Sequence, residues 1–499
     1  MSDTFLEMKH ISKLYAGVQA LDDVSFSLTR GEIHCLVGEN GSGKSTLIKV
    51  ISGVVNPEQG AEIIIEGQRL SIDHFSSKDS IDRGIHVIYQ DLSLFPNLTV
   101  RENISFNVHV ERGKKLVNWR DINSIAKGAI GDIGINIELE REVGTLSIAD
   151  QQLVAICKAL IGELKLLIMD EPTSSLTKNE VDSLFSVVKK LQKRGITTLF
   201  VSHKLNEILE IAERVTVLRD GKCVGVYDPD ELDHEKLTYL MTGKKIEYIK
   251  PDTSSISREV LLEVRDLSKK GNFKNISFKL YRGEILGITG LLGSGRTELA
   301  LAIFGINPAE KGQIVIDGKA VSIKSNKDAI HQGIGYVPED RLKLGLVMPQ
   351  SVSNNIIITV LQDLLNSLSM LDKEKRNSAI QRGIRDLAIR VPSVDSAVMT
   401  LSGGNQQRVV LAKWISTGPK ILILDEPTVG IDVAAKSSIH HIIKQLAAQG
   451  IGIILISDEI QETLYNCHRI LVMRKGRIVS ESQTSEMTEE ELFQIVNVG

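Results

Sequence analysis

The chain repeats itself, and this duplication limits its possible folds more than any other feature of the sequence. The segment Val37–Ser45 (VGENGSGKS) has a counterpart in Thr289–Thr297 (TGLLGSGRT), 252 positions later. The segment Leu167–Thr173 (LIMDEPT) returns as Leu422–Thr428 (LILDEPT), 255 positions later. A repeating unit of roughly 240 residues is too long for a solenoid, so each copy is expected to be a domain with its own hydrophobic core.

The duplication also sets the expected domain boundaries. A length of 499 residues alone would suggest about three domains, whereas the repeat predicts two larger ones. The segment 244–258 contains Pro251 and the polar run Asp252–Ser255, which is typical of a short exposed linker. We therefore expect a first domain at residues 1–243, a linker at 244–258 and a second domain at 259–499.

Composition and charge exclude several classes of protein. Hydrophobic residues make up 42% and charged residues 24%, as in soluble globular proteins, and the net charge of −4 disfavours a protein that coats nucleic acid. The longest apolar stretches, Ile451–Ile456 and Leu164–Met169, are far shorter than the ~20 residues that span a bilayer. Met1–His10 lacks the apolar core of a signal peptide. The four cysteines form no CxxC pair or His cluster, so we expect a soluble intracellular protein with reduced thiols.

The pattern of apolar residues predicts an α/β fold. Apolar runs rich in β-branched residues alternate with helical patterns, and the expected strands in the first copy are Ile33–Val37, Leu166–Met169, Ile196–Val201 and Val215–Leu218. A continuous apolar strand such as Leu166–Met169 is typical of a sheet that is covered on both faces. The segment Lys44–Ile51 predicts a helix that stops near Gly53. These alternating elements predict a mainly parallel sheet in each domain.

A phosphate-binding loop lies between an expected strand and an expected helix. Gly38–Ser45 satisfies the pattern GxxxxGK[ST]. Its glycines let backbone N–H groups turn towards phosphate oxygens, and the helix N-terminus adds a positive dipole. Lys44 is expected to reach the terminal phosphates, and the Ser45 hydroxyl to ligate Mg²⁺. The predicted nucleotide-binding residues are Gly38, Glu39, Asn40, Gly41, Ser42, Gly43, Lys44, Ser45 and Thr46.

An acidic pair follows the apolar strand of the first copy. Asp170 is suited to hold Mg²⁺ through its water shell, and Glu171 to polarise an attacking water. An acidic pair that merely begins a loop is common. This pair, however, lies 126 residues after Lys44 and is duplicated as Asp425 and Glu426, which favours a nucleotide-hydrolysing site.

Together with Leu401–Arg408 (LSGGNQQR), these motifs make the chain resemble a tandem ABC-transporter ATPase over essentially its whole length. The resemblance implies two P-loop nucleotide-binding domains, each with a mainly parallel sheet, an antiparallel β part and a helical insert. It further implies that Gln90 contacts Mg²⁺ and the partner, that His203 reaches the γ-phosphate and that Tyr15 stacks on adenine. A lone Tyr, Gln or His outside such a context is more often structural than catalytic.

The resemblance also implies two unequal ATP sites, because ABC domains pack head to tail. Each ATP then lies between the P-loop of one half and the signature of the other. The first site combines the first P-loop, Tyr15, Gln90, Asp170, Glu171 and His203 with the signature residues Ser402, Gly403, Gly404 and Asn405, and Asn405 is its one mild departure from the family pattern. The second site contains Gly290, Gly293, Ser294, Gly295, Arg296, Thr297 and Glu426, with Thr297 and Asp425 as its expected metal ligands.

The second site departs from the family pattern at almost every position. Arg296 replaces the P-loop lysine, and its planar fork is not equivalent to an ammonium group. Glu339 and Asp458 replace the Q-loop and switch residues and add negative charge near the γ-phosphate. Gly271 lies near the position of Tyr15, and the facing signature Leu146–Asp150 has lost both glycines. We expect the first site to hydrolyse ATP, with Glu171, His203 and Gln90 as catalytic residues, and the second to bind nucleotide without efficient turnover.

The resemblance narrows to the ATP-binding subunits of bacterial monosaccharide importers of the ribose, galactose, arabinose and xylose group. It rests on the Arg-type P-loop, on Tyr336–Arg341 (YVPEDR) and on the signature of the second half. It implies two membrane permease subunits as partners and, indirectly, a secreted or periplasmic sugar-binding protein. It also implies a peripheral position on the cytoplasmic face of the inner membrane, no nucleic acid partner and no need for a stable homodimer.

The permease contact is expected in the helical insert between Gln90 and Leu146, and in its counterpart between Glu339 and Leu401. Beside the Q-loop, the candidate contacts are Leu92, Leu94, Phe95 and Leu98. These side chains either face the permease or fill the core of the insert, and the sequence favours neither.

The main alternative function is that of a soluble twin-ABC ATPase acting on ribosomes. Such proteins resemble one another in a long, often basic linker and two near-consensus sites, whereas this linker is short and includes Glu247 and Asp252. A DNA-repair ABC ATPase is disfavoured because its zinc-binding cysteines are missing. The solute is not identified by the sequence, and a sugar-derived signal molecule or a nucleoside fits equally well.

Overall fold

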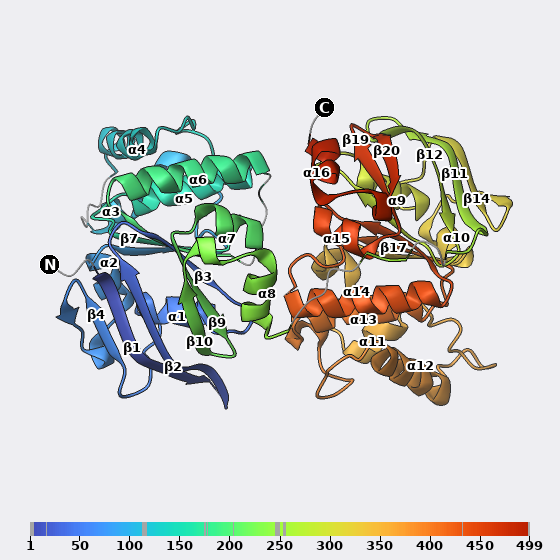
Figure 1. Cartoon of the computed structure of the whole chain (residues 1–499), viewed down its shortest axis with the longest axis horizontal. Coiled ribbons are helices and arrows are strands. Elements are labelled where there is room, and N and C mark those ends of the chain that lie inside the picture. Colours follow the sequence, from blue (N-terminus) through green and yellow to red (C-terminus); the bar gives the residue numbers. More distant parts are fainter. Residues whose placement is uncertain are drawn as a thin grey trace. The chain divides into compact units, whose positions relative to one another are not determined.

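The computed structural model describes residues 4–15, 17–111, 117–173, 176, 178–202, 204–244, 250–252, 256–431 and 433–497. It divides the chain into two compact units, residues 1–246 and 247–499 (Figure 1). The predicted linker, 244–258, lies in large part outside the described residues.

The first unit alternates strands and helices along the chain. Its strands are β1 (Thr4–Tyr15), β2 (Val18–Thr29), β3 (Ile33–Val37), β4 (Glu62–Ile65), β5 (Gln68–Arg69), β6 (Ile85–Ile88), β7 (Leu166–Asp170), β8 (Thr197–Val201), β9 (Arg214–Arg219) and β10 (Lys222–Tyr227). Its helices are α1 (Lys44–Ile51), α2 (Ser77–Asp82), α3 (Val100–Glu111), α4 (Trp119–Ile133), α5 (Ile148–Ala159), α6 (Lys178–Lys193), α7 (Leu205–Ile211) and α8 (His234–Thr242).

The second unit follows the same order. Its strands are β11 (Val260–Lys269), β12 (Phe273–Tyr281), β13 (Ile285–Thr289), β14 (Lys311–Ile316), β15 (Lys319–Val321), β16 (Ile334–Val337), β17 (Ile421–Asp425), β18 (Gly452–Ile456), β19 (Arg469–Arg474) and β20 (Arg477–Gln483). Its helices are α9 (Arg296–Ile303), α10 (Asn326–His331), α11 (Val352–Ile357), α12 (Lys373–Asp386), α13 (Gly403–Ile415), α14 (Val433–Ala448), α15 (Ile460–Asn466) and α16 (Glu489–Asn497).

Each unit contains one mainly parallel and one antiparallel sheet. In the first unit the six-stranded sheet has the order β10-β9-β3-β8-β7-β6, in which only the edge strand β10 runs antiparallel to its neighbour. The four-stranded antiparallel sheet has the order β2-β1-β4-β5. The second unit repeats both sheets, as β20-β19-β13-β18-β17-β16 and β12-β11-β14-β15.

The parallel sheet is covered on both faces, as the apolar strand β7 predicts. Leu166 and Ile168 belong to the core cluster shared with α1 and the antiparallel sheet. Leu167 and Met169, which alternate with them, belong to the cluster on the opposite face, shared with α5 and α6. Because successive side chains of a strand point to opposite faces, one apolar run supplies both cores.

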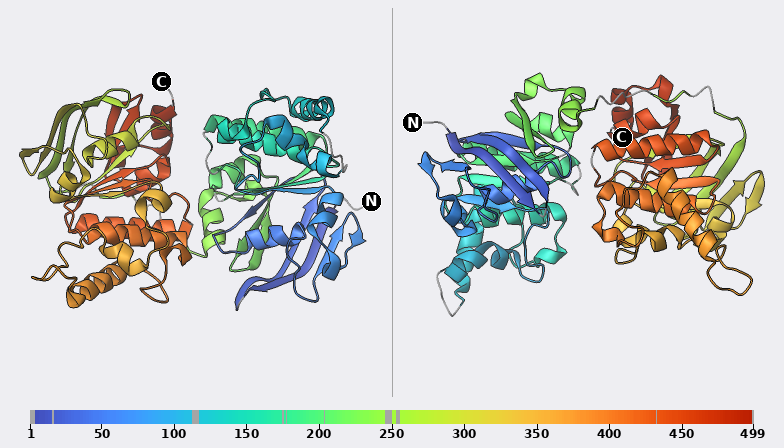
Figure 2. Two further views of the ribbon diagram at one scale, coloured as in Figure 1. Left: turned by 180° about the vertical axis from the view of Figure 1, so that it is seen from behind. Right: turned by 90° about the horizontal axis from the view of Figure 1, so that it is seen from below.

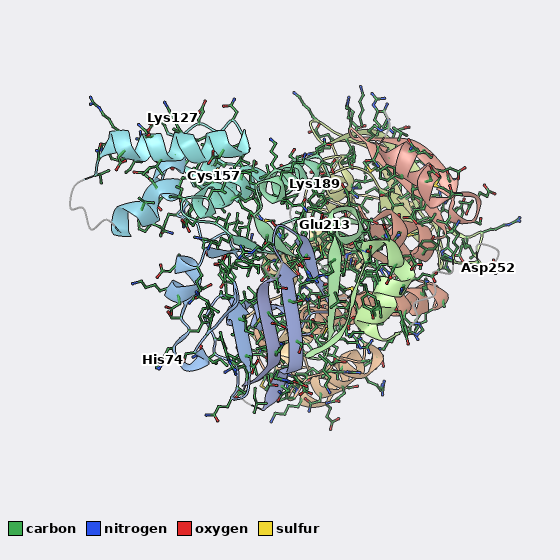
Figure 3. All side chains as sticks on the ribbon, turned by 60° about the vertical axis from the view of Figure 1, so that its left-hand side comes forward. His74, Lys127, Cys157, Lys189, Glu213 and Asp252 are labelled. Atoms are coloured by element: carbon green, nitrogen blue, oxygen red, sulfur yellow. The ribbon has the colours of Figure 1, made fainter. Side chains whose placement is uncertain are left out.

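The helical insert lies between β6 and β7 in the first unit. Its helices α3 and α4 pack on each other and on α5, and in the second unit α11 and α12 pack on each other and on α13. In each unit the insert and the antiparallel sheet lie at opposite ends (Figure 2). Figure 3 labels Lys127 on α4 at one end of the first unit and His74, beside the antiparallel sheet, at the other. The predicted α/β architecture, with its antiparallel part and helical insert, is thus confirmed.

None of the helices formed by the described residues has the length and apolarity that a membrane crossing requires.

An Arg–Glu ion pair joins the two sheets in each unit, and in the second unit both of its side chains are buried. Arg469 on β19 donates through Nε and Nη2 to the Glu284 carboxylate, at 2.9 and 3.1 Å, and through Nη2 to the Lys279 carbonyl oxygen of β12 at 2.6 Å. The two ionic side chains are only 7% and 1% exposed. The first unit has the same pair, with Arg214 Nη2 at 2.9 Å from Glu32 Oε1. Removal of one partner would leave a buried charge uncompensated.

We therefore expect Arg469→Ala to lower the free energy of unfolding of the second unit by about 3 kcal/mol. Urea unfolding measures this through Trp414 on α13, in a Trp119→Phe background that leaves no other tryptophan. The matched control is Arg385→Ala, because Arg385 pairs with Asp386 but is 79% exposed; its loss should stay below about 0.5 kcal/mol. Equal losses for the two variants would contradict a structural role for the buried pair.

Candidate functional site

The strand order of the first unit collects the predicted site residues at one edge of the parallel sheet. Strands β3, β8, β7 and β6 are neighbours and run parallel, so their carboxyl ends meet at the same edge. Gly38 follows β3, Ser202 follows β8, Asp170 ends β7 and Gln90 follows β6. Ligands of open α/β sheets bind in the crevice outside such an edge.

The phosphate-binding loop of the first unit packs directly on neighbouring backbone. A Cβ atom on Gly38 would overlap the carbonyl oxygen of Leu218 on β9. Gly43, which precedes α1, has a φ of 105°, and a Cβ there would lie 2.6 Å from the carbonyl oxygen of Ala20. Only glycine fits these two positions, because the loop backbone lies directly against β9 and β2.

Polar groups of this loop are arranged as a phosphate cradle. Lys44 is only 7% exposed, and its Nζ donates to the carbonyl oxygens of Gly38, at 2.7 Å, and Glu39, at 2.9 Å. The Ser42 hydroxyl is buried and has no hydrogen-bond partner among the described residues. A buried ammonium and an orphaned hydroxyl at a helix N-terminus suit phosphate oxygens.

The acidic pair lies at the end of β7. Burial, assisted by the adjacent Glu171 carboxylate, raises the pKa of Asp170, and the Lys44 ammonium opposes this. The backbone N–H of Glu171 donates to the Val201 carbonyl oxygen at 2.9 Å, and its φ of 50° is an uncommon left-handed conformation for a non-glycine residue. Glu171 therefore lies in a constrained turn directly after β7.

Oxygen donors that suit Mg²⁺ surround the same edge. Ser45 and Gln90 are exposed, and Asp170 is partly exposed. Hydroxyl, amide and carboxylate oxygens are hard ligands of the kind that Mg²⁺ takes, so these three residues fit the ion. Tyr15 ends β1 and is 40% exposed. His203 lies outside the described residues.

A buried glutamate that sequence reasoning missed connects two loops of this edge. Glu207 on α7 is 8% exposed, and its Oε2 accepts hydrogen bonds from the hydroxyls of Thr173, at 2.5 Å, and Ser202, at 3.1 Å. It therefore ties the loop after Glu171 to the loop after β8. Glu462 accepts hydrogen bonds from Thr428 and Ser457 in the second unit. Each of the three residues in the first unit has an identical residue 255 positions later. This repetition was the signal in the sequence that could have identified the Glu–Thr–Ser link.

The second unit builds the same loop with a different cation. A Cβ on Gly290 would overlap the carbonyl oxygen of Met473 on β19, and Gly295 precedes α9 with a φ of 98°. Arg296 is 7% exposed, with Nη1 at 3.7 Å from Glu426 Oε1. Neither this Nη1 nor the hydroxyl of Ser294 has a hydrogen-bond partner among the described residues.

The acidic pair of the second unit, Asp425 and Glu426, is buried and hydrogen-bonded. Asp425 accepts hydrogen bonds from Thr297 Oγ1, at 3.2 Å, and the Tyr336 hydroxyl, at 3.0 Å, and burial raises the pKa of Asp425 to about 6. Glu426 Oε1 accepts the backbone N–H of Asp458 at 2.8 Å. Burial and the Asp458 carboxylate raise the pKa of Glu426, and this favours its neutral form.

Three further positions at which the second unit departs from the family pattern are Glu339, Asp458 and Gly271. Glu339 and Asp458, at the predicted Q-loop and switch positions, are both exposed. Gly271 has a φ of 83° in the tight turn between β11 and β12. This turn carries no aromatic side chain corresponding to Tyr15.

The two signature segments begin corresponding helices but differ in their caps. Ser147 accepts the backbone N–H of Asp150 at 3.1 Å and so caps α5. Ser402, before α13, makes no such cap; its hydroxyl instead accepts from Asn405 Nδ2 at 3.1 Å.

The glycines of the second signature are also required by packing. A Cβ on Gly403 would lie 3.0 Å from Arg341 Nη2, and one on Gly404 would lie 2.8 Å from Ala435 Cβ. These residues belong to the second unit, whereas the P-loop, Asp170, Glu171 and Gln90 belong to the first.

The chain is similar to known proteins over nearly its whole length. The model of the ABC transporter family matches residues 21–174 and 273–429. The chain is 42% identical, over 98% of its length and 96% of the relative's, to the putative ribose/galactose/methyl galactoside import ATP-binding protein 1 of Agrobacterium fabrum. The ribose import ATP-binding protein RbsA of Clostridium tetani gives the same identity and coverages. The solved structure of a nucleotide-free ATP-binding cassette from an ABC transporter aligns at 25% identity and a TM-score of 0.41, over 45% of this chain and 91% of that chain.

Gly38→Ala tests the first P-loop. Because the added methyl group would overlap the Leu218 carbonyl oxygen, the loop must shift, and we expect the affinity of the first unit for ATP to fall at least about tenfold. Isothermal titration of the full chain measures the loss. Gly128→Ala is the control, since a Cβ at that helical position meets nothing within 4 Å. Unchanged binding in Gly38→Ala would place the phosphates elsewhere.

Proposed function

Since this chain belongs to the ABC transporter family, we propose that it is the ATP-hydrolysing subunit that energises monosaccharide uptake through a membrane importer. The observation that carries this proposal is a duplicated P-loop cassette, matched over 98% of the chain by relatives named as sugar import ATP-binding proteins. The solute is a pentose, a hexose or a related sugar. Acting on ribosomes, the alternative function, finds no support in these relatives.

The first unit provides the hydrolytic chemistry. Lys44 neutralises the terminal phosphates, and Glu171 polarises the attacking water from the turn after β7. Mg²⁺, held by Ser45, Gln90 and Asp170, supplies further neutralisation of phosphate charge. His203 contacts the γ-phosphate, and Tyr15 stacks on adenine.

The second unit holds nucleotide but turns it over slowly. Arg296 provides the charge for binding, yet its guanidinium lies beside Glu426, whose Oε1 also accepts the Asp458 N–H. A carboxyl group engaged by these two neighbours is not presented to an attacking water as a general base. The exposed Glu339 and Asp458 carboxylates add negative charge where the first unit has Gln90 and His203.

Residues 1–243 and 259–499 act as the two ATPase domains, with 244–258 as their linker. Their partners are two permease subunits and, indirectly, a secreted or periplasmic sugar-binding protein. The chain then works as a peripheral protein on the cytoplasmic face of the inner membrane, and it needs no second copy because both ATPase domains are on one chain. ATP-driven closure of the domains pushes the permeases through alternate access.

The permease contact is assigned to the exposed part of the insert. Leu92 and Leu94 pack against the core of the first unit, which supports the structural interpretation for these two. Phe95 is 42% exposed and packs on Phe106, which is 39% exposed, with ring centroids 4.9 Å apart. This exposed aromatic pair beside the Q-loop is the candidate anchor for a permease.

Paired substitutions test the asymmetry. Glu171→Gln should lower phosphate release by the complex with its permeases at least about tenfold, whereas Glu426→Gln should change it less than about twofold, because Glu426 performs no proton transfer. The pair Lys44→Ala and Arg296→Ala should follow the same order. Equal losses within each pair would rule out the asymmetry.

Phe95→Ala tests the permease contact. We expect sugar transport by the assembled complex to fall at least about tenfold, as for a central interface anchor, while ATP binding by the subunit is unchanged. Tyr239→Ala, at a residue of the same unit that is 52% exposed, is the control and should leave transport unaltered. Normal transport in Phe95→Ala would support a role for Phe95 within the insert alone.

A further inference from the structure

The two acidic residues that end β7 and β17 differ in their availability to a metal ion. Asp170 is partly exposed, and no described residue donates a hydrogen bond to its carboxylate. Asp425 is 0% exposed, and each of its oxygens accepts a hydroxyl, one from Thr297 and one from Tyr336. A carboxylate that holds Mg²⁺ through the ion's water shell must be open to water, and Asp425 is closed.

The difference originates in one side chain on β16. Tyr336 lies three positions before Glu339, where the first unit has Val87 three positions before Gln90. Its ring is 4% exposed and packs on Phe304, with centroids 5.3 Å apart. Held by this packing, the hydroxyl points at Asp425. The expected metal set of Thr297 and Asp425 therefore does not fit an ion held through water.

The second unit nevertheless presents a built site for phosphate. Arg296 is 7% exposed, and its Nη1 has no hydrogen-bond partner among the described residues; the same holds for the hydroxyl of Ser294. A guanidinium stays charged at any pH that proteins tolerate, and its donors match phosphate oxygens two at a time. Arg296 carries the same single positive charge as Lys44 of the first P-loop, but its planar fork can hold two phosphate oxygens at once.

We propose that the second unit binds its nucleotide without requiring Mg²⁺, and that Tyr336 is the positioning residue that keeps Asp425 from the metal. The inference rests on the proposed function for the identity of the ligand, ATP. Nucleotide binding then depends on Mg²⁺ in the first unit, where Asp170 is open to the ion's water shell. It does not depend on Mg²⁺ in the second unit, where Asp425 is closed.

Equilibrium dialysis of the full chain with radiolabelled ATP, in excess Mg²⁺ and in EDTA, tests this. Lys44→Ala leaves the second unit as the main site, and there removal of Mg²⁺ should weaken binding less than about threefold. Arg296→Ala leaves the first unit, where the same removal should weaken binding at least about tenfold. Equal metal dependence in the two variants would overturn the inference. Absence of ATP binding in both would instead overturn the proposed function.

Mn²⁺ gives an independent readout. At saturating ATP, electron paramagnetic resonance of the unmodified chain should detect one tightly bound Mn²⁺ for two bound nucleotides. Two bound ions per chain would overturn the inference, even if Arg296→Ala failed to fold.

Tyr336→Phe tests the positioning residue. In the Lys44→Ala background it keeps the ring and removes the hydroxyl, so binding at the second unit should gain a metal dependence of at least about threefold. Tyr239→Phe, at an exposed tyrosine, is the control and should change nothing. Binding that stays metal-independent in Tyr336→Phe would refute the role of Tyr336.

Discussion

Direct contact between two stretches of backbone makes each phosphate-binding loop possible. The loop after the central strand lies so close to the next parallel strand that a single methyl group at Gly38 or Gly290 would overlap a carbonyl oxygen. Each loop therefore lies directly against the neighbouring strand, immediately before α1 or α9. Because the loop is rigidly supported, a phosphate meets groups that are already in place.

The strand order of the parallel sheet places the other candidate site residues beside the phosphate-binding loop. Across the sheet the order is β3-β8-β7-β6 in the first unit and β13-β18-β17-β16 in the second. These strands lead, in that order, to the P-loop, the switch position, the acidic pair and the Q-loop position. Loops far apart in sequence thereby share one edge. One buried carboxylate in each unit, Glu207 in the first and Glu462 in the second, accepts hydrogen bonds from two neighbouring loops and so holds them together.

The two halves share the contacts that hold their folds together but differ in residues at the phosphate-binding site. The Arg–Glu pair that joins the sheets and the Glu–Thr–Ser links occur in both halves, and they connect segments that are far apart in the sequence. Around the phosphate site, by contrast, the second half has Arg296, Tyr336 and Glu339 where the first has Lys44, Val87 and Gln90. The two halves thus share one scaffold but differ in the polar contacts of the P-loop cation and of the first acidic residue.

The sequence was sufficient for the two-fold repeat, the parallel sheet and the P-loop residues, since periodicity and glycine spacing are local properties of the chain. The strand Leu166–Met169 and the helix Lys44–Ile51 follow from such patterns, and the structure confirms both. The role of Leu92 and Leu94 stayed open, because burial depends on what packs against a side chain.

Only the tertiary structure decided which polar groups meet. Glu207 and Thr173 are 34 positions apart, and Tyr336 and Asp425 are 89 positions apart. No local pattern links residues at such separations. Asp425 and Asp170 stand in nearly identical sequence, yet one is closed and the other is open, because a tyrosine on a neighbouring strand fills the space where a valine stands in the first unit.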